Sequence, residues 1–263
     1  MKGLAGKRIL VTRSSKQAEE TGRDLRRLGA KPILFPCLDF RYNPQQVKHG
    51  LALLKKPETE VLFTSSNAIH AVHKQLKDKF SSFFENIPVA VVGTKTAAVA
   101  TSFGIRPQLV PKEFSQEGLF AAYQQRGFPK RLIFFRAARG RDWLLKMLED
   151  RGVTVHLIPS YQCVLPDDDP APIIQALLDN KIDAVLLGSS KTAINYVSRV
   201  GNSALAGKPV VAVLSNHVAK TARELSLGVQ VVATEASFET LLLDMEKYFE
   251  QLETRRDGIY ANH

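Results

Sequence analysis

The chain has 263 residues, of which 44% are hydrophobic and 24% charged, a composition that excludes a disordered, collagen-like or coiled-coil protein. Its net charge of +10 favours a polyanionic partner, such as nucleic acid, an anionic membrane or a small polycarboxylate or phosphate, over a merely cationic surface. The longest apolar runs, such as 89–92 and 184–187, are too short to span a membrane, and two cysteines exclude a disulfide framework and a four-cysteine metal site.

Short β-rich runs alternate with helical stretches along the first half of the chain. The predicted strands cover 8–13, 31–36, 61–65, 88–93 and 108–111. The predicted helices cover 16–28, 67–76 and 94–103, with a short helix after Ser115. Strands that alternate with helices of about ten residues indicate βαβ units and parallel sheets. Because these strands are apolar throughout, the sheets should be covered on both faces.

The second half of the chain repeats the order of the first. Segment 131–136 matches 8–13, and Arg13 and Arg136 each stand 16 residues before a glycine and 23 residues before a proline. Three further matches pair 184–197 with 60–72, 208–222 with 87–98, and 236–242 with 114–120. The repetition predicts an α/β fold of two similar lobes, each a parallel sheet flanked by helices.

Two Pro-rich polar segments, 36–44 and 159–170, are the predicted connections between the lobes. If each crosses from one lobe to the other, the topology is interleaved. The predicted boundaries are then 1–36 with 166–263 for the first lobe, 42–160 for the second, and 37–41 and 161–165 for the linkers. Residues 42–160 hold 17 Lys and Arg but 9 Asp and Glu, so the basic charge lies mostly on the second lobe. We expect the tail, 252–263, to fray.

Small polar residues stand where predicted strands meet helices. Ligands of open α/β sheets bind beyond the carboxyl ends of the strands, and the free N–H groups of helix N-termini attract anions there. N-capping alone explains each serine or threonine singly, but six such turns on corresponding edges favour an anion-binding cleft. The candidate binding residues of these turns are Thr12, Arg13, Ser65, Ser66, Asn67, Gly93, Thr96, Ser115, Ser189, Ser190, Asn216 and His217.

Arg136, Arg139 and Arg141 belong to the densest basic patch and are candidate carboxylate ligands, because a guanidinium pairs bidentately with a carboxylate. The alternative is surface pairing with Asp142 or Glu149. We expect Arg136→Ala to remove a contact worth roughly 1.5–3 kcal/mol to substrate binding if the residue is desolvated. An unchanged affinity would make Arg136 a surface residue.

Tyr161, on the second linker, is the candidate catalytic residue, because a phenol there could donate a proton or hydrogen bond to a leaving hydroxyl. Packing of the ring with a solvated hydroxyl is the alternative. The motifs GxGxxG, GxxxxGK[ST], GxSxG and HExxH are absent. His70 and His73 are spaced for one helix face but lack a third ligand, so we expect them at the surface or capping a helix, with no metal site.

Together these segments resemble the uroporphyrinogen-III synthase family. The resemblance rests on GKRILVTR (6–13), LGAKPILFP (28–36), VLFTSSNAI (61–69), VAVVGTKTAAVATSFG (89–104), FSQEGL (114–119), RGVTVHLIPSYQ (151–162) and AVLLGSSKTAINYV (184–197). It implies two α/β lobes joined by a two-stranded linker. It also implies cofactor-free cyclisation of hydroxymethylbilane, a linear tetrapyrrole polycarboxylate, to uroporphyrinogen III in porphyrin and heme biosynthesis. Ring D is inverted and water is lost.

By this resemblance, Tyr161 aligns with a family tyrosine thought to assist departure of the hydroxyl, and five candidates fall on positions that line the family's cleft: Thr12, Arg13, Ser65, Thr96 and Ser189. One turn departs from the family pattern. Where the first half has Gly93-Thr94-Lys95-Thr96, the second has Ser215-Asn216-His217-Val218, and a valine cannot donate the hydrogen bond of a threonine. Asn216 or His217 could substitute for it.

Two alternatives to the synthase stay open. The altered 215–218 turn suits a tetrapyrrole-binding relative without activity, and the charge alone suits a two-lobed module for another polyanion. The chain has no recognised nucleic-acid-binding motif, which argues against nucleic acid as the polyanionic partner. The start of the chain lacks the apolar core and cleavage site of a signal peptide, so we expect a cytoplasmic protein without membrane contact. We also expect a monomer.

Overall fold

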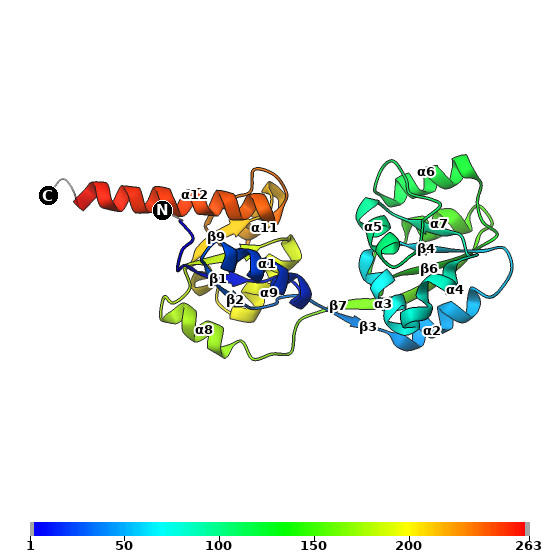
Figure 1. Cartoon of the computed structure of the whole chain (residues 1–263), viewed down its shortest axis with the longest axis horizontal. Helices are drawn as coiled ribbons and strands as arrows, with labels where there is room; N and C mark the ends of the chain where they lie inside the picture. Colours follow the sequence, from blue (N-terminus) through cyan, green and yellow to red (C-terminus); the bar gives the residue numbers. More distant parts are fainter. Residues whose placement is uncertain (1–2, 261–263) are drawn as a thin grey trace. The chain divides into compact units, whose positions relative to one another are not determined.

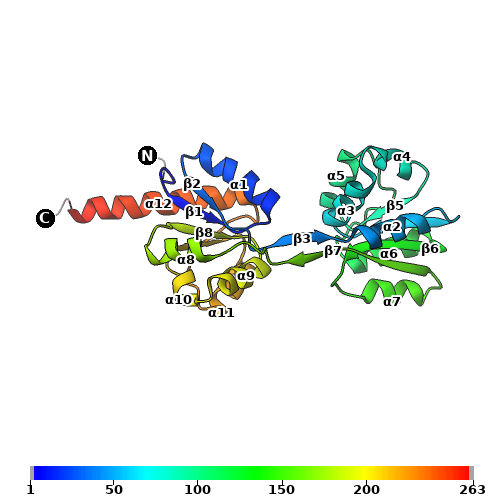
Figure 2. The same ribbon diagram turned by 90° about the horizontal axis from the view of Figure 1, so that it is seen from below.

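The computed structural model describes residues 3–260, and the chain divides into two compact α/β units. Unit 1 comprises the residues up to Asp39 and those from Val164 onward, and unit 2 is Phe40–Cys163. Both boundaries fall inside the segments predicted as linkers, 37–41 and 161–165. The chain passes from unit 1 to unit 2 through β3 (Asp39–Tyr42) and returns through β7 (Thr154–Val164), and these two strands are neighbours in one sheet (Figure 2).

The sheet of unit 1 has the strand order β10-β9-β8-β1-β2, and every neighbouring pair is parallel. The strands are β1 (Arg8–Val11), β2 (Lys31–Leu34), β8 (Ala184–Leu187), β9 (Val210–Val213) and β10 (Val229–Val232). Strands from the start of the chain therefore share a sheet with strands from its last third, as the blue and yellow elements of Figure 1 show. The predicted interleaved topology is confirmed.

Helices cover both faces of this sheet because successive strand residues point to opposite sides. Leu10 belongs to the core beneath one set of helices, whereas its neighbours Ile9 and Val11 belong to the core beneath the other. The first set comprises α8 (Ala171–Leu178), α9 (Ser190–Val200), α10 (Ser203–Ala206) and α11 (Asn216–Glu224). The second set comprises α1 (Ser15–Arg27) and α12 (Phe238–Tyr260).

The sheet of unit 2 has the order β3-β7-β6-β4-β5, in which the pairs from β7 to β5 are parallel. Its remaining strands are β4 (Thr59–Phe63), β5 (Val89–Val91) and β6 (Arg131–Ala137). The predicted strand 108–111 is reduced to a single parallel bridge between Ala90 and Leu109. Proline has no N–H to donate to a ladder, and Pro107 and Pro111 flank this bridge, which explains why the strand does not extend.

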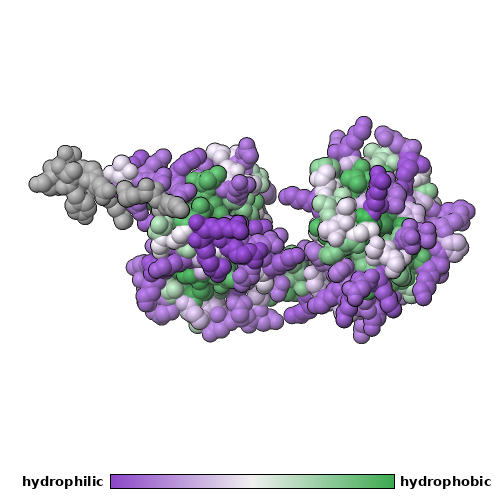
Figure 3. Space-filling model, viewed as in Figure 1, coloured by the Kyte–Doolittle hydropathy of each residue, from purple (hydrophilic) through white to green (hydrophobic). Residues whose placement is uncertain are grey.

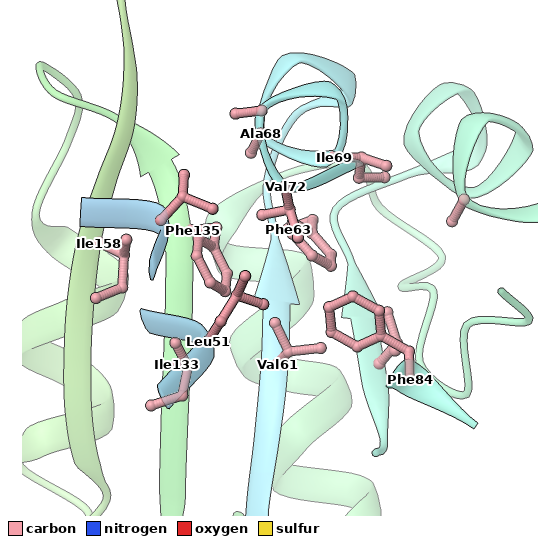
Figure 4. Close-up of a cluster of buried hydrophobic side chains, with 14 of the residues drawn as sticks. Leu51, Val61, Phe63, Ala68, Ile69, Val72, Phe84, Ile133, Phe135 and Ile158 are labelled. Atoms are coloured by element: carbon pink, nitrogen blue, oxygen red, sulfur yellow. The ribbon is translucent and has the colours of Figure 1, made fainter. Parts of the chain in front are cut away.

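Unit 2 is layered in the same way. One face packs against α2 (Pro44–Leu53), α3 (Ser66–Leu76), α4 (Phe80–Phe84) and α5 (Thr94–Ser102), and the other against α6 (Gln116–Arg126) and α7 (Trp143–Glu149). A 3₁₀ turn (Lys77–Lys79) joins α3 to α4. Phe63 and Phe135 stack at the centre of the first core, with ring centroids 5.4 Å apart (Figure 4). A Cβ on Gly50 would lie 2.7 Å from the Phe135 ring, so this glycine allows α2 to approach β6 closely.

The long terminal helix differs from the expectation for the tail. Residues 252–260, which we expected to fray, continue α12, and residues 261–263 lie outside the described part of the chain. Among the described helices, none is long and apolar enough to cross a membrane. Hydrophilic side chains cover much of the visible face of each unit (Figure 3).

The two cysteines lie in different environments, and we predict that their thiols react differently. Cys163 is exposed, whereas burial raises the pKa of Cys37 to about 12, despite the nearby charge of Arg199. Because the thiolate is the reactive form, Cys37 should be inert in the native protein. Titration with Ellman's reagent at pH 8 should modify one thiol at once and the second only after unfolding in urea. In Cys163→Ser the fast phase should be absent, and rapid modification of both native thiols would contradict the burial of Cys37.

Candidate functional site

Tyr161 and Ser65 form a hydrogen-bonded pair at the carboxyl end of the unit 2 sheet. Ser65 follows β4 and adopts an extended conformation that caps α3, its Oγ accepting a hydrogen bond of 3.2 Å from the Ala68 N–H. The same Oγ lies 2.9 Å from the Tyr161 hydroxyl, and either oxygen can be the donor. Ser66 and Asn67 form the first turn of α3, beside this pair.

The Tyr161 ring is held from several sides. The residue is only 7% exposed, and its ring packs edge-on against Phe40 with the centroids 5.8 Å apart. The register of β6 and β7 shifts between Arg136 and Ala137, so that Ala137 pairs with Tyr161. Burial raises the pKa of Tyr161, although hydrogen bonding to Ser65 and Asn67 lowers it in part. The phenol therefore keeps its proton at neutral pH and can donate it.

The second polar turn of unit 2 joins β5 to α5. Gly93 is fully extended, and a Cβ there would lie 3.0 Å from the ring of Phe114, which is itself 61% exposed. Thr96 is buried in the first turn of α5. Ser115 caps α6 by accepting a 2.9 Å hydrogen bond from the Gly118 N–H. These residues lie at helix N-termini, where N–H groups face outward.

The three candidate arginines of unit 2 occupy very different environments. Arg136 is 7% exposed, and its terminal nitrogens donate to the Arg141 carbonyl at 2.6 Å and to Asp142 Oδ1 at 2.5 Å. Its Nε is buried without a hydrogen-bond partner among the described residues. Arg141 is exposed and pairs with Glu117 at 2.5 Å, and Arg139 is exposed. The pairing with Asp142 that the sequence left open is present, and a role of Arg136 in substrate binding stays a prediction.

In unit 1, Thr12 and Arg13 follow β1. Thr12 is fully buried and donates its hydroxyl hydrogen to the Leu186 carbonyl at 2.5 Å, so this hydroxyl joins β1 to β8. Arg13 is half-buried: Nη1 donates to Thr21 Oγ1 at 2.8 Å, and the guanidinium carbon lies 3.8 Å from the centroid of the Phe238 ring. Burial lowers the pKa of Arg13, while the charge of Glu20 raises it.

Three serines organise the other turns of unit 1. Ser189 caps α9 by accepting a 3.1 Å hydrogen bond from the Thr192 N–H. Ser190 Oγ lies 2.7 Å from Thr221 Oγ1, which joins α9 to α11. Ser215 caps α11 by accepting from the Val218 N–H at 3.4 Å.

The 215–218 turn thus has its hydroxyl in a different place from the matching turn of unit 2. Unit 2 has a glycine at the cap and a buried threonine three residues later, whereas unit 1 has Ser215 at the cap and Val218 buried in the threonine position. Asn216 and His217 are exposed in the first turn of α11. They are available to a ligand, but the buried position offers only a valine side chain.

The two histidines noted in the sequence pack against an aromatic ring. His73 stacks on Phe103 with centroids 3.9 Å apart, and His70 meets the same ring edge-on at 5.5 Å. Both histidines are partly exposed, as a surface position requires, and they also pack against this ring. Within the described residues, no three potential metal-ligating side chains gather at one place.

The structure brings some candidates together and adds residues that sequence reasoning missed. Tyr161 contacts Ser65, and Arg136 contacts the Arg141 backbone, whereas Arg13 and Arg136 lie in different units. Phe238, which stacks on Arg13, was not identified from the sequence. The sequence feature that could have indicated Phe238 is indirect. Gly188 occupies the position of Thr64 in the first half of the chain, and the absence of a side chain at Gly188 leaves room for an aromatic ring.

Known proteins match this chain over most of its length. A family model described as uroporphyrinogen-III synthase HemD matches residues 19–242. A Synechococcus elongatus protein named uroporphyrinogen-III synthase is 29% identical over 258 residues, which cover 94% of this chain and 97% of that protein.

Two solved structures have similar folds. A mutant uroporphyrinogen III synthase from Thermus thermophilus has a TM-score of 0.59 at 16% identity and covers 95% of this chain and 100% of that one. The synthetase from Helicobacter pylori has a TM-score of 0.57 at 16% identity, with 90% of this chain and 96% of that one covered. These structures show the fold, and the family model spans strands and turns of both units. The chain therefore belongs to the uroporphyrinogen-III synthase HemD family.

Proposed function

We propose that the protein is a uroporphyrinogen-III synthase, which cyclises hydroxymethylbilane to uroporphyrinogen III with inversion of ring D and loss of one water. The observation that carries this proposal is the family match over residues 19–242. The chemistry of the chain agrees with it. The substrate bears carboxylates on every ring, and the chain offers a net charge of +10 with arginines and helix N-termini at the carboxyl ends of its strands.

In the proposed mechanism, Tyr161 assists the departure of the hydroxyl group from ring A. Its phenol donates a proton as the C–O bond breaks, so hydroxide leaves as water, and an azafulvenium cation and a tyrosinate remain. Ring D then attacks through its substituted carbon to give a spiro intermediate, which opens and recloses with ring D inverted. The proton released when the macrocycle closes returns to the tyrosinate, so one water is the only other product.

Positioning supplies much of the catalysis in this proposal, because the bilane is reactive and closes spontaneously to the type I isomer. The protein must hold the two ends of the substrate so that attack at the substituted carbon is favoured. We assign carboxylate binding to Arg13, Arg139 and Arg141. The predicted part of Arg136 in substrate binding is then to anchor, through the Arg141 carbonyl, the loop that carries Arg139 and Arg141. The remaining contacts come from Thr12, Ser65, Ser66, Asn67, Gly93, Thr96, Ser115, Ser189, Ser190, Asn216 and His217.

Product isomers test the proposed function directly. The protein is incubated with freshly prepared hydroxymethylbilane, and the products are oxidised and separated by chromatography. Type III product above the spontaneous type I background is the expected result. Binding of the bilane without type III formation would instead identify a non-catalytic relative, for which the buried Val218 gives a specific reason. Salt-sensitive retention of DNA or RNA, with no effect on the bilane, would identify another kind of polyanion-binding module.

We also propose that the protein acts as a monomer in the cytoplasm. Each unit buries its own apolar cores on both faces of its sheet, which a monomer requires. The exposed thiol of Cys163 suits a reducing compartment. Light scattering at several protein concentrations should give the mass of one chain, and a mass that doubles would contradict the monomer.

A further inference from the structure

Arginines at several places in the described chain lie over aromatic rings, and three of them, Arg13, Arg136 and Arg199, differ in what their nitrogens bind. Arg199 lies 4.1 Å from the Phe35 ring centroid and donates to the Pro36 carbonyl and to Asp168. Arg136 lies 5.7 Å from the Phe134 centroid and has its terminal nitrogens occupied. The terminal nitrogens of both arginines are therefore paired within the protein, and the unpaired Nε of Arg136 is buried.

Arg13 is different because one edge of its guanidinium is open. Nη1 donates to Thr21, but within the described residues neither Nε nor Nη2 has a hydrogen-bond partner, and no carboxylate pairs with the group. Nε and Nη2 lie side by side and point the same way, which is the geometry that binds the two oxygens of a carboxylate. The two arginines that the repeat matches have thus diverged: Arg136 is paired internally, and Arg13 is available.

The Phe238 ring determines how Arg13 is presented. At 3.8 Å from its centroid, the guanidinium is the nearest of the three to an aromatic ring, and such stacking restricts the plane of the group while leaving its edges free. The ring is seated in turn on Gly188, at the end of β8. A Cβ on that glycine would lie 2.6 Å from Phe238 Cζ, a distance that would force the ring to move.

We propose that Phe238 is a positioning residue for substrate binding: seated on Gly188, it holds the guanidinium of Arg13 so that the Nε and Nη2 edge receives one carboxylate of the tetrapyrrole. This inference rests on the proposed function for the identity of the ligand. It goes beyond that function in assigning one carboxylate to a defined edge of Arg13, and in giving Phe238 and Gly188 a part in recognition.

The test measures two quantities in the full-length protein: the KM and kcat of type III formation, and the Kd of uroporphyrin III, a stable octacarboxylate, from its fluorescence. Arg13→Ala should raise KM and Kd by about 10- to 100-fold, because a charge-assisted contact is lost. Phe238→Leu keeps an apolar side chain but removes the ring, and should raise both by about 3- to 10-fold with kcat unchanged. Gly188→Ala, which displaces the ring, should resemble Phe238→Leu.

Phe249→Leu is the matched control. Phe249 lies on the same helix, in the apolar core against which Phe238 packs, and has Lys7 over its ring at 5.2 Å. It should lower the unfolding temperature without changing Kd. A double-mutant cycle adds a readout that a structural role would not move: in the Arg13→Ala background, Phe238→Leu should have no further effect on Kd.

Several results would overturn the proposal. These are an unchanged Kd in Arg13→Ala, an equal rise in Phe249→Leu, or a Phe238→Leu effect that persists without Arg13. The Kd measurement also separates this inference from the proposed function. A wild-type protein that makes no type III product but shows the predicted pattern of Kd values would reject the synthase and retain the carboxylate site.

Discussion

Replacing Tyr161 with phenylalanine should slow formation of the type III isomer by about 100-fold, the lower end of the range for a positioned proton donor. Hydroxide is a poor leaving group, and the phenol is protonated at neutral pH, since burial raises its pKa further above the ordinary value of 10.0. The effect should stay at the low end because the bilane also loses its hydroxyl without help. The measurement is kcat for type III product, with Kd for uroporphyrin III unchanged.

The pH dependence of the rate follows from the same group. A raised pKa keeps Tyr161 protonated up to and beyond its ordinary value of 10.0, so its loss as a donor should appear only as an alkaline fall in rate above that pH. The Phe variant should lack this fall. Ser65 still caps α3 in the variant, because the Ala68 N–H does not depend on the tyrosine.

Tyr196→Phe is the matched control for this substitution. Tyr196 is also buried and donates its hydroxyl hydrogen to the Ala206 carbonyl at 2.9 Å, but it belongs to the core of unit 1. Its loss should cost stability and leave the rate of type III formation intact. If Tyr161→Phe turned over at the wild-type rate, Tyr161 would be a packing residue, and the proton would come from water or from the carboxylic acids of the substrate.

Replacing Glu60 with alanine should lower the free energy of unfolding of unit 2 by about 2–4 kcal/mol. Glu60 lies in β4 and is 4% exposed. Its Oε1 accepts a 2.7 Å hydrogen bond from the Tyr123 hydroxyl, and its Oε2 accepts one from Arg126. The substitution leaves a buried hydroxyl without an acceptor and a partly buried guanidinium without its counter-charge, and neither loss can be fully repaired by water.

Urea unfolding followed by tryptophan fluorescence measures this effect, because Trp143 is the single tryptophan of the chain and lies in unit 2. Tyr123→Phe, which removes only the hydroxyl, should cost about 1 kcal/mol. Glu58→Ala is the matched control: Glu58 pairs with Lys130 at 2.7 Å, but both side chains are exposed, so its loss should cost at most about 1 kcal/mol. Equal midpoints for Glu60→Ala and Glu58→Ala would show that the buried cluster is not a source of stability.

The architecture of this protein could be predicted from its sequence, because it depends on the periodicity of apolar residues and on the internal repeat. The apolar run at 8–13, repeated at 131–136 with the same distance to a following proline, predicts two sheets built alike, and the interleaving of the chain follows from where the linkers stand. The helix N-caps could also be predicted from the sequence. Ser65, Ser115 and Ser189 each accept a hydrogen bond from the backbone N–H of the residue three positions later. Such features are local, or repeat a local pattern, so no knowledge of distant contacts is needed.

Partner choice among side chains was decided only by the tertiary structure. The spacing of the internal repeat makes Arg13 and Arg136 equivalent positions. In the structure, however, Arg136 is buried and paired with Asp142. The guanidinium of Arg13 instead lies over Phe238, which is distant in the sequence, and its Nε and Nη2 edge is unpaired within the described residues. Tyr161 on β7 likewise meets Ser65, which follows β4 and lies 96 residues away in the sequence. These contacts depend on three-dimensional packing between distant segments, which determines the partner that each charged or polar group meets, and no local sequence pattern encodes that choice.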